Sequence, residues 1–313
     1  MEKMIRLRDF VKFKGCYFSV VSYFNSNYVK CLLRYIPCEM LTKKDKKQEV
    51  RVGDLCYVKL NHSEALEYFK EYQKDGIFFI PEKGVSVLKP EVLTPEIVKR
   101  DEKVARVYDL FSPIPKTHKG ITGSRLIGLA KESSDVDFVV YGKWWNTARE
   151  IVKKGIESGL LQYPDWKKIY EKRKPVIDFE TFVAHELRKF NRAVLNGIYF
   201  DLLYVRDYDC LHIYPEVSGV KLGRVKLRGV VKDDSAVFDY PARYPLANVD
   251  LKIREVEVLC FTHTYTAQAF KGERVEVSGV LEKTPEGYKV IVGTRRESDE
   301  YIISEDLVKR LRR

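Results

Sequence analysis

The segment GITGSRLIGLAKESSDVDFVVYG, residues 120–142, constrains the fold of this chain more than any other stretch. It places Asp135 and Asp137 at the start of a hydrophobic run that is typical of a buried strand. Successive side chains of a strand alternate between the two faces of a sheet, so both carboxylates are expected on one face. Two ionised carboxylates repel each other, and a hard divalent cation such as Mg²⁺ or Mn²⁺ would neutralise them. A turn cap at Asp135 and an exposed edge position at Asp137 are the alternative interpretation.

A glycine-serine pair, Gly123 and Ser124, precedes the carboxylates by about ten residues. Glycine permits a tight backbone approach, and the N–H groups at the start of a short helix could hold phosphate oxygens together with the Ser124 hydroxyl. Gly128 is expected to end that helix. The sequence therefore predicts a phosphate site beside a metal site.

This combination resembles the DNA polymerase beta-like nucleotidyltransferase superfamily, in which a glycine-serine motif, a spacer of this length and an Asp-x-Asp pair follow one another. The sequence Ser134-Asp135-Val136-Asp137, together with Gly128, is especially similar to archaeal CCA-adding enzymes and other minimal or predicted archaeal nucleotidyltransferases. The resemblance covers little more than this one segment. It implies that Asp135 and Asp137 bind two Mg²⁺ or Mn²⁺ ions, and that Gly123, Ser124 and Arg125 contact the β and γ phosphates of a nucleoside triphosphate (NTP).

The superfamily takes a third carboxylate from a later strand, and the run IYFDLLYV offers Asp201. Its alternative interpretation is a partly exposed edge position. Asp207 and Asp209 follow that strand at an expected turn and are weaker candidates. With Asp201 in place, the resemblance implies transfer of a nucleoside monophosphate from an NTP to a hydroxyl by a two-metal, in-line mechanism.

The acceptor is less constrained than the reaction. A net charge of +11 and a predicted C-terminal barrel favour RNA, including tRNA. Transfer to a protein or a small molecule would use the same site. A binding protein that retains the nucleotidyltransferase scaffold without catalysis is a further alternative.

The predicted fold class is α+β, with three parts along the chain. Residues 1–92 are expected to form an accessory α+β domain, residues 93–215 the nucleotidyltransferase domain, and residues 216–313 a small barrel similar to an OB-fold. The predicted helices cover 63–75, 96–111, 144–158, 166–173 and 179–195. The predicted strands include a hairpin within 16–37 and the segments 77–81, 136–141, 198–205, 223–233, 255–265, 272–284 and 288–294. Residues 42–54 are expected to be an exposed loop.

Several other groups of residues are weaker candidates for binding. Basic side chains that could meet phosphate, or could line a solvated helix face, are Lys167, Lys168, Lys172, Arg173, Lys174, Arg188, Lys189, Arg192, Arg295, Arg296 and the tail 309–313. Aromatic side chains that could stack on bases, or could fill a barrel core, are Phe238, Tyr240, Tyr244, Phe261, His263 and Tyr265. His118 lies before the glycine-serine pair and could touch substrate.

Cysteine spacing and hydropathy indicate the redox state of the cysteines and the cellular location of the protein. Six cysteines show no CxxC spacing, so reduced thiols without a structural zinc site are expected. We find neither an apolar run long enough to cross a bilayer nor the pattern of a secretory signal, so a cytoplasmic protein without membrane partners is expected.

Overall fold

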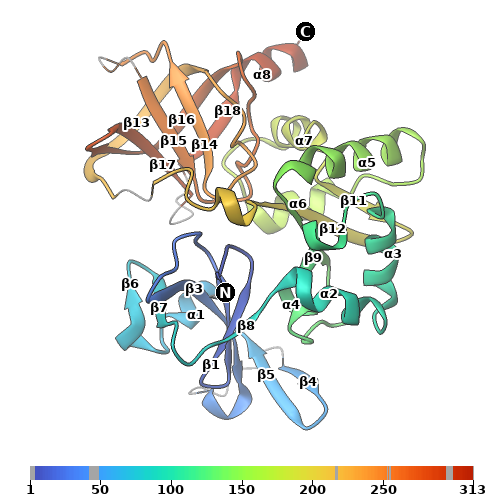
Figure 1. The fold of residues 1–313 in the computed structure, drawn as a ribbon. Coiled ribbons are helices and arrows are strands. Elements are labelled where there is room, and N and C mark those ends of the chain that lie inside the picture. The colour runs from blue at the N-terminus through green and yellow to red at the C-terminus, as the bar shows by residue number, and fades with distance from the viewer. Residues whose placement is uncertain are drawn as a thin grey trace. The chain divides into compact units, whose positions relative to one another are not determined.

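The computed structural model describes residues 4–41, 49–215, 218–251, 253, 255–293 and 299–312, and Figure 1 shows their arrangement. Within these ranges the fold mixes helices with sheets, which confirms an α and β composition. The strands are β1 (Phe10–Phe13), β2 (Cys16–Val20), β3 (Tyr28–Pro37), β4 (Glu49–Val52), β5 (Leu55–Lys59), β6 (Gln73–Lys74), β7 (Ile77–Pro81), β8 (Ser86–Leu88), β9 (Lys119–Thr122), β10 (Val136–Tyr141), β11 (Arg192–Leu195), β12 (Ile198–Val205), β13 (Val220–Val231), β14 (Ala242–Ala247), β15 (Glu255–Cys260), β16 (Arg274–Thr284), β17 (Gly287–Val292) and β18 (Tyr301–Ser304). The helices are α1 (His62–Ala65), α2 (Pro90–Val98), α3 (Glu102–Leu110), α4 (Gly123–Leu126), α5 (Trp145–Glu157), α6 (Trp166–Arg173), α7 (Phe179–Leu187) and α8 (Glu305–Leu311).

The first eight strands form one sheet in the order β4-β5-β3-β2-β1-β8, with β7 pairing with β3 and β6. The expected hairpin is present as β2 and β3, and the side chain of Asn25 closes the connection by accepting a hydrogen bond from the Lys30 amide. The helix expected over 63–75 is wrong beyond α1, because Phe69 has a left-handed backbone and β6 pairs with β7. Part of the expected loop 42–54 is strand β4, whereas residues 42–48 lie outside the described residues.

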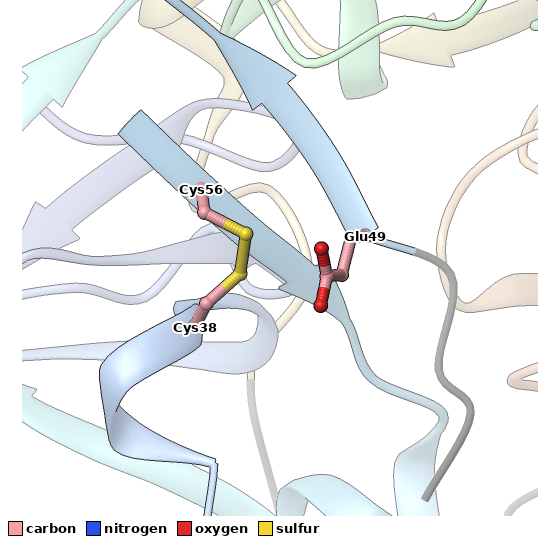
Figure 2. A group of neighbouring side chains, drawn as sticks. All are labelled: Cys38, Glu49 and Cys56. Atoms are coloured by element: carbon pink, nitrogen blue, oxygen red, sulfur yellow. A yellow bond between two sulfur atoms is a disulfide. The ribbon is translucent and has the colours of Figure 1, made fainter. Parts of the chain in front are cut away.

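A disulfide joins Cys38 to Cys56, with the carboxylate of Glu49 nearby (Figure 2). It links the residue after β3 to strand β5. The expectation that all the cysteines are reduced thiols is therefore wrong for this pair. Sequence spacing concealed it, because 18 residues separate the two cysteines and only the β3–β5 pairing brings them together.

The second sheet has the order β11-β12-β10-β9 and carries the segment singled out by the sequence. Strand β10 occupies the range predicted for it, and α5 follows it as expected. The single helix expected over 96–111 is two helices, α2 and α3, because Asp101 caps a new helix by accepting a hydrogen bond from the Val104 amide. Phe111 packs against Phe138 and Phe200 beneath the central strands.

The helix expected over 179–195 is wrong beyond Leu187. Phe190 has a left-handed backbone, with φ of 50°, and the chain then forms strand β11. Asn196 and Gly197 both have positive φ and turn β11 into β12, as an Asn-Gly hairpin requires.

The chain divides into two units, residues 1–162 with 191–215 and residues 163–190 with 216–313. The predicted domain ranges placed 163–190 in the nucleotidyltransferase domain, whereas in the structure these residues belong with the C-terminal strands. Phe182 of α7 is fully buried in one hydrophobic cluster with residues of β13 to β18, such as Leu227 and Val277. Helices α6 and α7 therefore complete the core of the second unit.

The C-terminal sheet of the second unit has the order β13-β14-β15-β17-β16-β18. Its neighbours pair in antiparallel fashion except β15 and β17, which are parallel. Strand β13 pairs with β16 as well as with β14. Strands β14 and β18 and helix α8 were not predicted. Among the helices that the structure describes, none is long and apolar enough to span a membrane.

Within the first unit, a buried group that we call the Arg6 cluster fixes the N-terminal sheet to the second sheet. The guanidinium of Arg6 lies 3.1 Å from Glu91 and over the rings of Tyr141 and Tyr208. Both tyrosine hydroxyls donate to the Glu91 carboxylate, at 2.9 and 2.8 Å. Arg6 also donates to the carbonyl of Arg206, at 3.3 Å. These contacts link the segment before β1 to α2, to β10 and to the residues after β12, and so hold the N-terminal sheet against the second sheet.

Candidate active site

Four side chains stand in one row across the second sheet, and we call them the carboxylate row. Asp137 of β10 is paired in register with Asp201 of β12 on one side and with Thr122 of β9 on the other. Arg192 of β11 is paired with Asp201. Directly paired residues project from the same face of a sheet. The structure therefore brings two of the three predicted carboxylates together, although they are 64 residues apart in the chain.

Gly123 lies directly against the carboxylate row. Its φ is +72°, and a Cβ atom at this position would stand 2.2 Å from Oδ2 of Asp137. No side chain fits there, because real Cβ contacts are longer and L-residues are strained at this φ. Glycine is thus required for the backbone to turn past the carboxylate and start α4, which places Ser124 beside Asp137.

Asp135 is exposed and comes one residue before β10, so it stands at the end of the strand rather than inside it. Arg125, the expected phosphate contact, is buried and holds this end of the strand. Its Nε donates to the Asp135 carbonyl at 3.1 Å, its Nη2 donates to the Ser134 carbonyl at 2.6 Å, and Nη1 pairs with Asp101. All three groups of the guanidinium thus contact the protein itself, which argues against the predicted phosphate contact of Arg125. Gly128, with φ of +72°, allows the turn after α4.

Arg192 pairs with the third carboxylate. Its Nε donates to Oδ1 of Asp201 at 2.5 Å, and both side chains are largely buried. Arg192, for which a phosphate contact or a solvated helix face was predicted, does not lie on a solvated helix face, because it is in strand β11 and only 5% of the residue is exposed. The ion pair orients the Asp201 carboxylate on the same face as Asp137.

The charge balance of the carboxylate row is unfavourable for two ionised acids. The pKa of Asp137 is raised to about 6, first by burial, then by the negative charge of Asp201 and, to a smaller extent, by that of Asp135. Positive charges on Arg8 and Lys59 oppose this rise. A carboxylate with a raised pKa beside a second carboxylate is the arrangement that a bound divalent cation would relieve.

The three carboxylates do not converge as tightly as the closest potential ligands in the described part of the chain. Those are Cys38, Glu49 and Cys56, whose ligand atoms lie within 4.8 Å of one another, but the two sulfur atoms are joined to each other and are not thiolates (Figure 2). Asp135 is exposed and lies one residue before β10, whereas Asp137 and Asp201 are paired within the sheet. The donor set there is all oxygen, which fits Mg²⁺ or Mn²⁺.

Several weaker candidates lie away from the carboxylate row. His118 precedes β9 and stands 3.9 Å from Asp207, which follows β12. Strand β9 runs antiparallel to β10 and pairs Lys119 with Val140, so this end of the sheet is opposite to the end that carries Asp137. His118, Asp207 and Asp209 are thus separated from the two paired carboxylates.

Two of the basic side chains of the second unit are committed within that unit. Arg188 forms an ion pair with Glu273 at 2.6 Å, and Lys189 is buried with Glu186 at 2.6 Å. Among the aromatic candidates, Tyr244 and Tyr265 are core residues. The predicted pair Arg295 and Arg296 lies outside the described residues.

Three residues near the carboxylate row were not predicted, namely Arg8 in the turn before β1, Tyr35 of β3 and Lys59 of β5. The Thr122 hydroxyl donates to the Arg8 carbonyl at 2.7 Å. The side chain of Tyr35 is hydrogen-bonded to that of Ser124, and Lys59 is paired in register with Tyr35. No local sequence signal marks these residues, because their proximity depends on how two sheets pack.

Comparison with known proteins identifies a domain that contains Gly123, Ser124 and Asp137. Residues 110–189 match the family model described as a nucleotidyltransferase domain. The chain is also similar to the uncharacterized protein MJ1086 of Methanocaldococcus jannaschii, with 32% identity over 340 aligned positions that cover 95% of this chain and 98% of that protein. No solved structure matches the chain at a significant level.

Proposed function

Because the chain belongs to the polymerase beta-like nucleotidyltransferases, in a family with MJ1086, we propose that it transfers a nucleoside monophosphate from an NTP to a hydroxyl acceptor. The observation that carries this proposal is the in-register pairing of Asp137 with Asp201, with Gly123 against the Asp137 carboxylate. Two acids on one face and a glycine without room for a side chain are the parts that such a transfer needs. In this proposal Asp135, Asp137 and Asp201 hold two Mg²⁺ or Mn²⁺ ions.

The residues of the site have separate tasks in this mechanism. Asp137 and Asp201 set the position of the reacting phosphate, because their backbones are fixed by neighbouring strands. Ser124 and the backbone after Gly123 face the β and γ phosphates, and Gly128 allows the turn that closes this segment. When bound, divalent cations supply charge neutralisation at the triphosphate and a lowered pKa for the acceptor hydroxyl.

We propose RNA, including tRNA, as the acceptor. In the second unit β13 pairs with β14, β14 with β15, β15 with β17, β17 with β16, and β16 again with β13. This circular order, with a parallel β15–β17 pair, supports an OB-like barrel, a fold that commonly binds oligonucleotides.

A group of partly exposed aromatic side chains in the second unit adds support for a nucleic-acid acceptor. The ring of Tyr240 stacks on that of His263 at 5.8 Å and meets the edge of Phe261 at 6.0 Å. Such rings can stack on unpaired bases.

The decisive experiment is a labelling reaction with the full chain. The protein is incubated with each α-labelled NTP, Mg²⁺ or Mn²⁺, and either total RNA or cell lysate, and the products are separated on gels. We expect label on an RNA band for the wild type and none for Asp137→Asn. Label on a protein band would replace RNA by a protein acceptor.

Asp209→Asn is the matched control for this experiment. Asp209 is an exposed aspartate after β12, and its loss removes the same charge without touching the carboxylate row. The control is expected to label as the wild type does. If no NTP gives a product and none binds in the presence of metal, the chain is a scaffold without transferase activity.

A further inference from the structure

The N-terminal sheet supplies side chains to the phosphate side of the candidate site. We propose that Lys59 and Arg8 bind the triphosphate tail of the incoming NTP, and that Tyr35 is a positioning residue that holds Ser124 for the same phosphates. This inference rests on the proposed function, and it deepens that function by assigning part of the NTP site to the accessory sheet.

The order of strands in the second sheet defines which side is the phosphate side. Asp201 lies on β12, Asp137 on β10, and Thr122 ends β9 at the opposite edge from β11. Gly123 and Ser124 continue from that edge into α4. The hydrogen bond from the Thr122 hydroxyl to the Arg8 carbonyl puts the N-terminal chain at this edge, next to Ser124 and away from Arg192.

Strands β3 and β5 carry the next two residues of the proposed site. Tyr35 and Lys59 are direct partners across these strands, so their side chains project from the same face. The Lys59 amino group lies 5.9 Å from the centre of the Tyr35 ring. Tyr35 is buried and hydrogen-bonded to Ser124, whereas Lys59 is exposed. Tyr35 therefore contacts both the exposed Lys59 and Ser124, the expected phosphate contact.

Electrostatic effects on Asp137 agree with this geometry. Arg8 and Lys59 both act to lower the pKa of Asp137. The placement of the two cations rests on geometry, since Lys59 is paired with Tyr35 and the Arg8 carbonyl is hydrogen-bonded to Thr122.

The position of the two strands is fixed by covalent and buried contacts. The Cys38–Cys56 disulfide (Figure 2) lies three residues from Tyr35 along β3 and three residues from Lys59 along β5. The Arg6 cluster holds the segment that contains Arg8 against the second sheet. Side chains on supported elements of this kind are preorganised for binding.

The test is equilibrium binding of ATP, GTP, CTP and UTP to the full chain in the presence of Mg²⁺, measured by titration calorimetry without any acceptor. For the NTP that binds the wild type, we expect Lys59→Gln to weaken binding about tenfold, as loss of a charged hydrogen bond does. Binding of the matching nucleoside monophosphate is expected to change less than twofold, because it lacks the β and γ phosphates.

Three further single variants, and Tyr35→Phe combined with Ser124→Ala, separate the roles. Lys74→Gln removes an exposed lysine from β6 of the same sheet and is expected to bind as the wild type does. Tyr35→Phe is expected to weaken NTP binding about threefold to tenfold through the lost hydrogen bond to Ser124. In a Ser124→Ala background the same substitution is expected to have little further effect. Arg8→Gln is expected to resemble Lys59→Gln.

The possible failures are distinguishable. Absence of NTP binding by the wild type with Mg²⁺ or Mn²⁺ would overturn the proposed function itself. Wild-type binding with an unchanged affinity in both Lys59→Gln and Arg8→Gln would overturn only the role of the N-terminal sheet. An equal loss of NTP and monophosphate binding in these variants would also contradict it, because the contact would then not be to the triphosphate tail.

Discussion

The pKa values of Glu91 and Asp137, two acidic residues of the first unit, are shifted in opposite directions, although burial acts to raise both. In the Arg6 cluster, burial is the largest effect and acts to raise the pKa of Glu91, but the charge of Arg6 and the hydrogen bonds from the backbone, Tyr208 and Tyr141 together hold that pKa below its usual value. In the carboxylate row, burial and the charge of Asp201 act together and raise the pKa of Asp137 to about 6. One cluster contains its own counter-charge, and the other has more negative than positive charge. The first arrangement stabilises the buried acid with a positive charge, whereas the second is the place where we propose that a divalent cation binds.

The largest effect is expected from removing the negative charge of Asp137. Asp137→Asn should reduce nucleotide transfer about a thousandfold or more, because several kcal/mol of charge stabilisation are lost. Its melting temperature without metal should be equal to or above that of the wild type, since a repulsion is removed. Labelling rates and thermal unfolding measure the two effects. A large fall in stability would mean that Asp137 is a structural residue.

Arg6→Met tests the contribution of the Arg6 cluster to stability. It should lower the free energy of unfolding by about 3–5 kcal/mol, because Glu91 is left buried without its counter-charge. Combining it with Glu91→Gln should restore part of the loss. Urea unfolding of the two single variants and the double variant gives these values. A loss below about 1 kcal/mol for Arg6→Met would remove the distinction between the clusters.

The stability of the metal-free protein should depend on pH through Asp137. Its folded pKa of about 6 lies above the value of about 3.9 for an unfolded aspartate, so folding favours the protonated form. This contribution is fully present below about pH 4 and is lost as the pH rises through about 6. Relative to Asp137→Asn, the wild type should lose on the order of 3 kcal/mol over that range. Parallel pH profiles of the two proteins would argue against the raised pKa.

The smallest of these effects is expected from the addition of divalent cations. Mg²⁺ or Mn²⁺ at about ten times its dissociation constant should stabilise the wild type by about 1.4 kcal/mol at pH 7.5, and removal by a chelator should reverse this. Arg6→Met should keep the shift, whereas Asp137→Asn should lose it. The shift should also shrink below about pH 6, where Asp137 takes up a proton. An equal shift in all three proteins would place the cation elsewhere.

The sequence could predict the central strands of the site because their signals are local. Strand β10 follows from one hydrophobic run, and the tight backbone turn at Gly123 follows from one glycine. The pairing of Asp137 with Asp201 was expected from the resemblance, and the register of β10 and β12 places them side by side. Strand β11 could have been recognised from the Asn196-Gly197 hairpin turn, a signal that was interpreted as a helix end.

Other features could not be predicted because they depend on long-range packing. The disulfide requires the β3–β5 pairing, and the contacts of Tyr35 and Arg8 require one sheet to be placed against another. The true partners of Arg125 are two carbonyl groups and Asp101. A basic residue beside a phosphate motif has the same sequence signal whether it binds a ligand or the protein's own backbone.

The chain leaves the first unit after residue 162, returns at 191 and leaves again after 215. The second unit is therefore not a module that a gene fusion could add at the end of an existing coding sequence. A protein that stopped at residue 215 would keep Phe182 but lose the C-terminal strands that bury it. Premature termination should thus yield a product with an uncovered aromatic helix, which cellular proteases would remove.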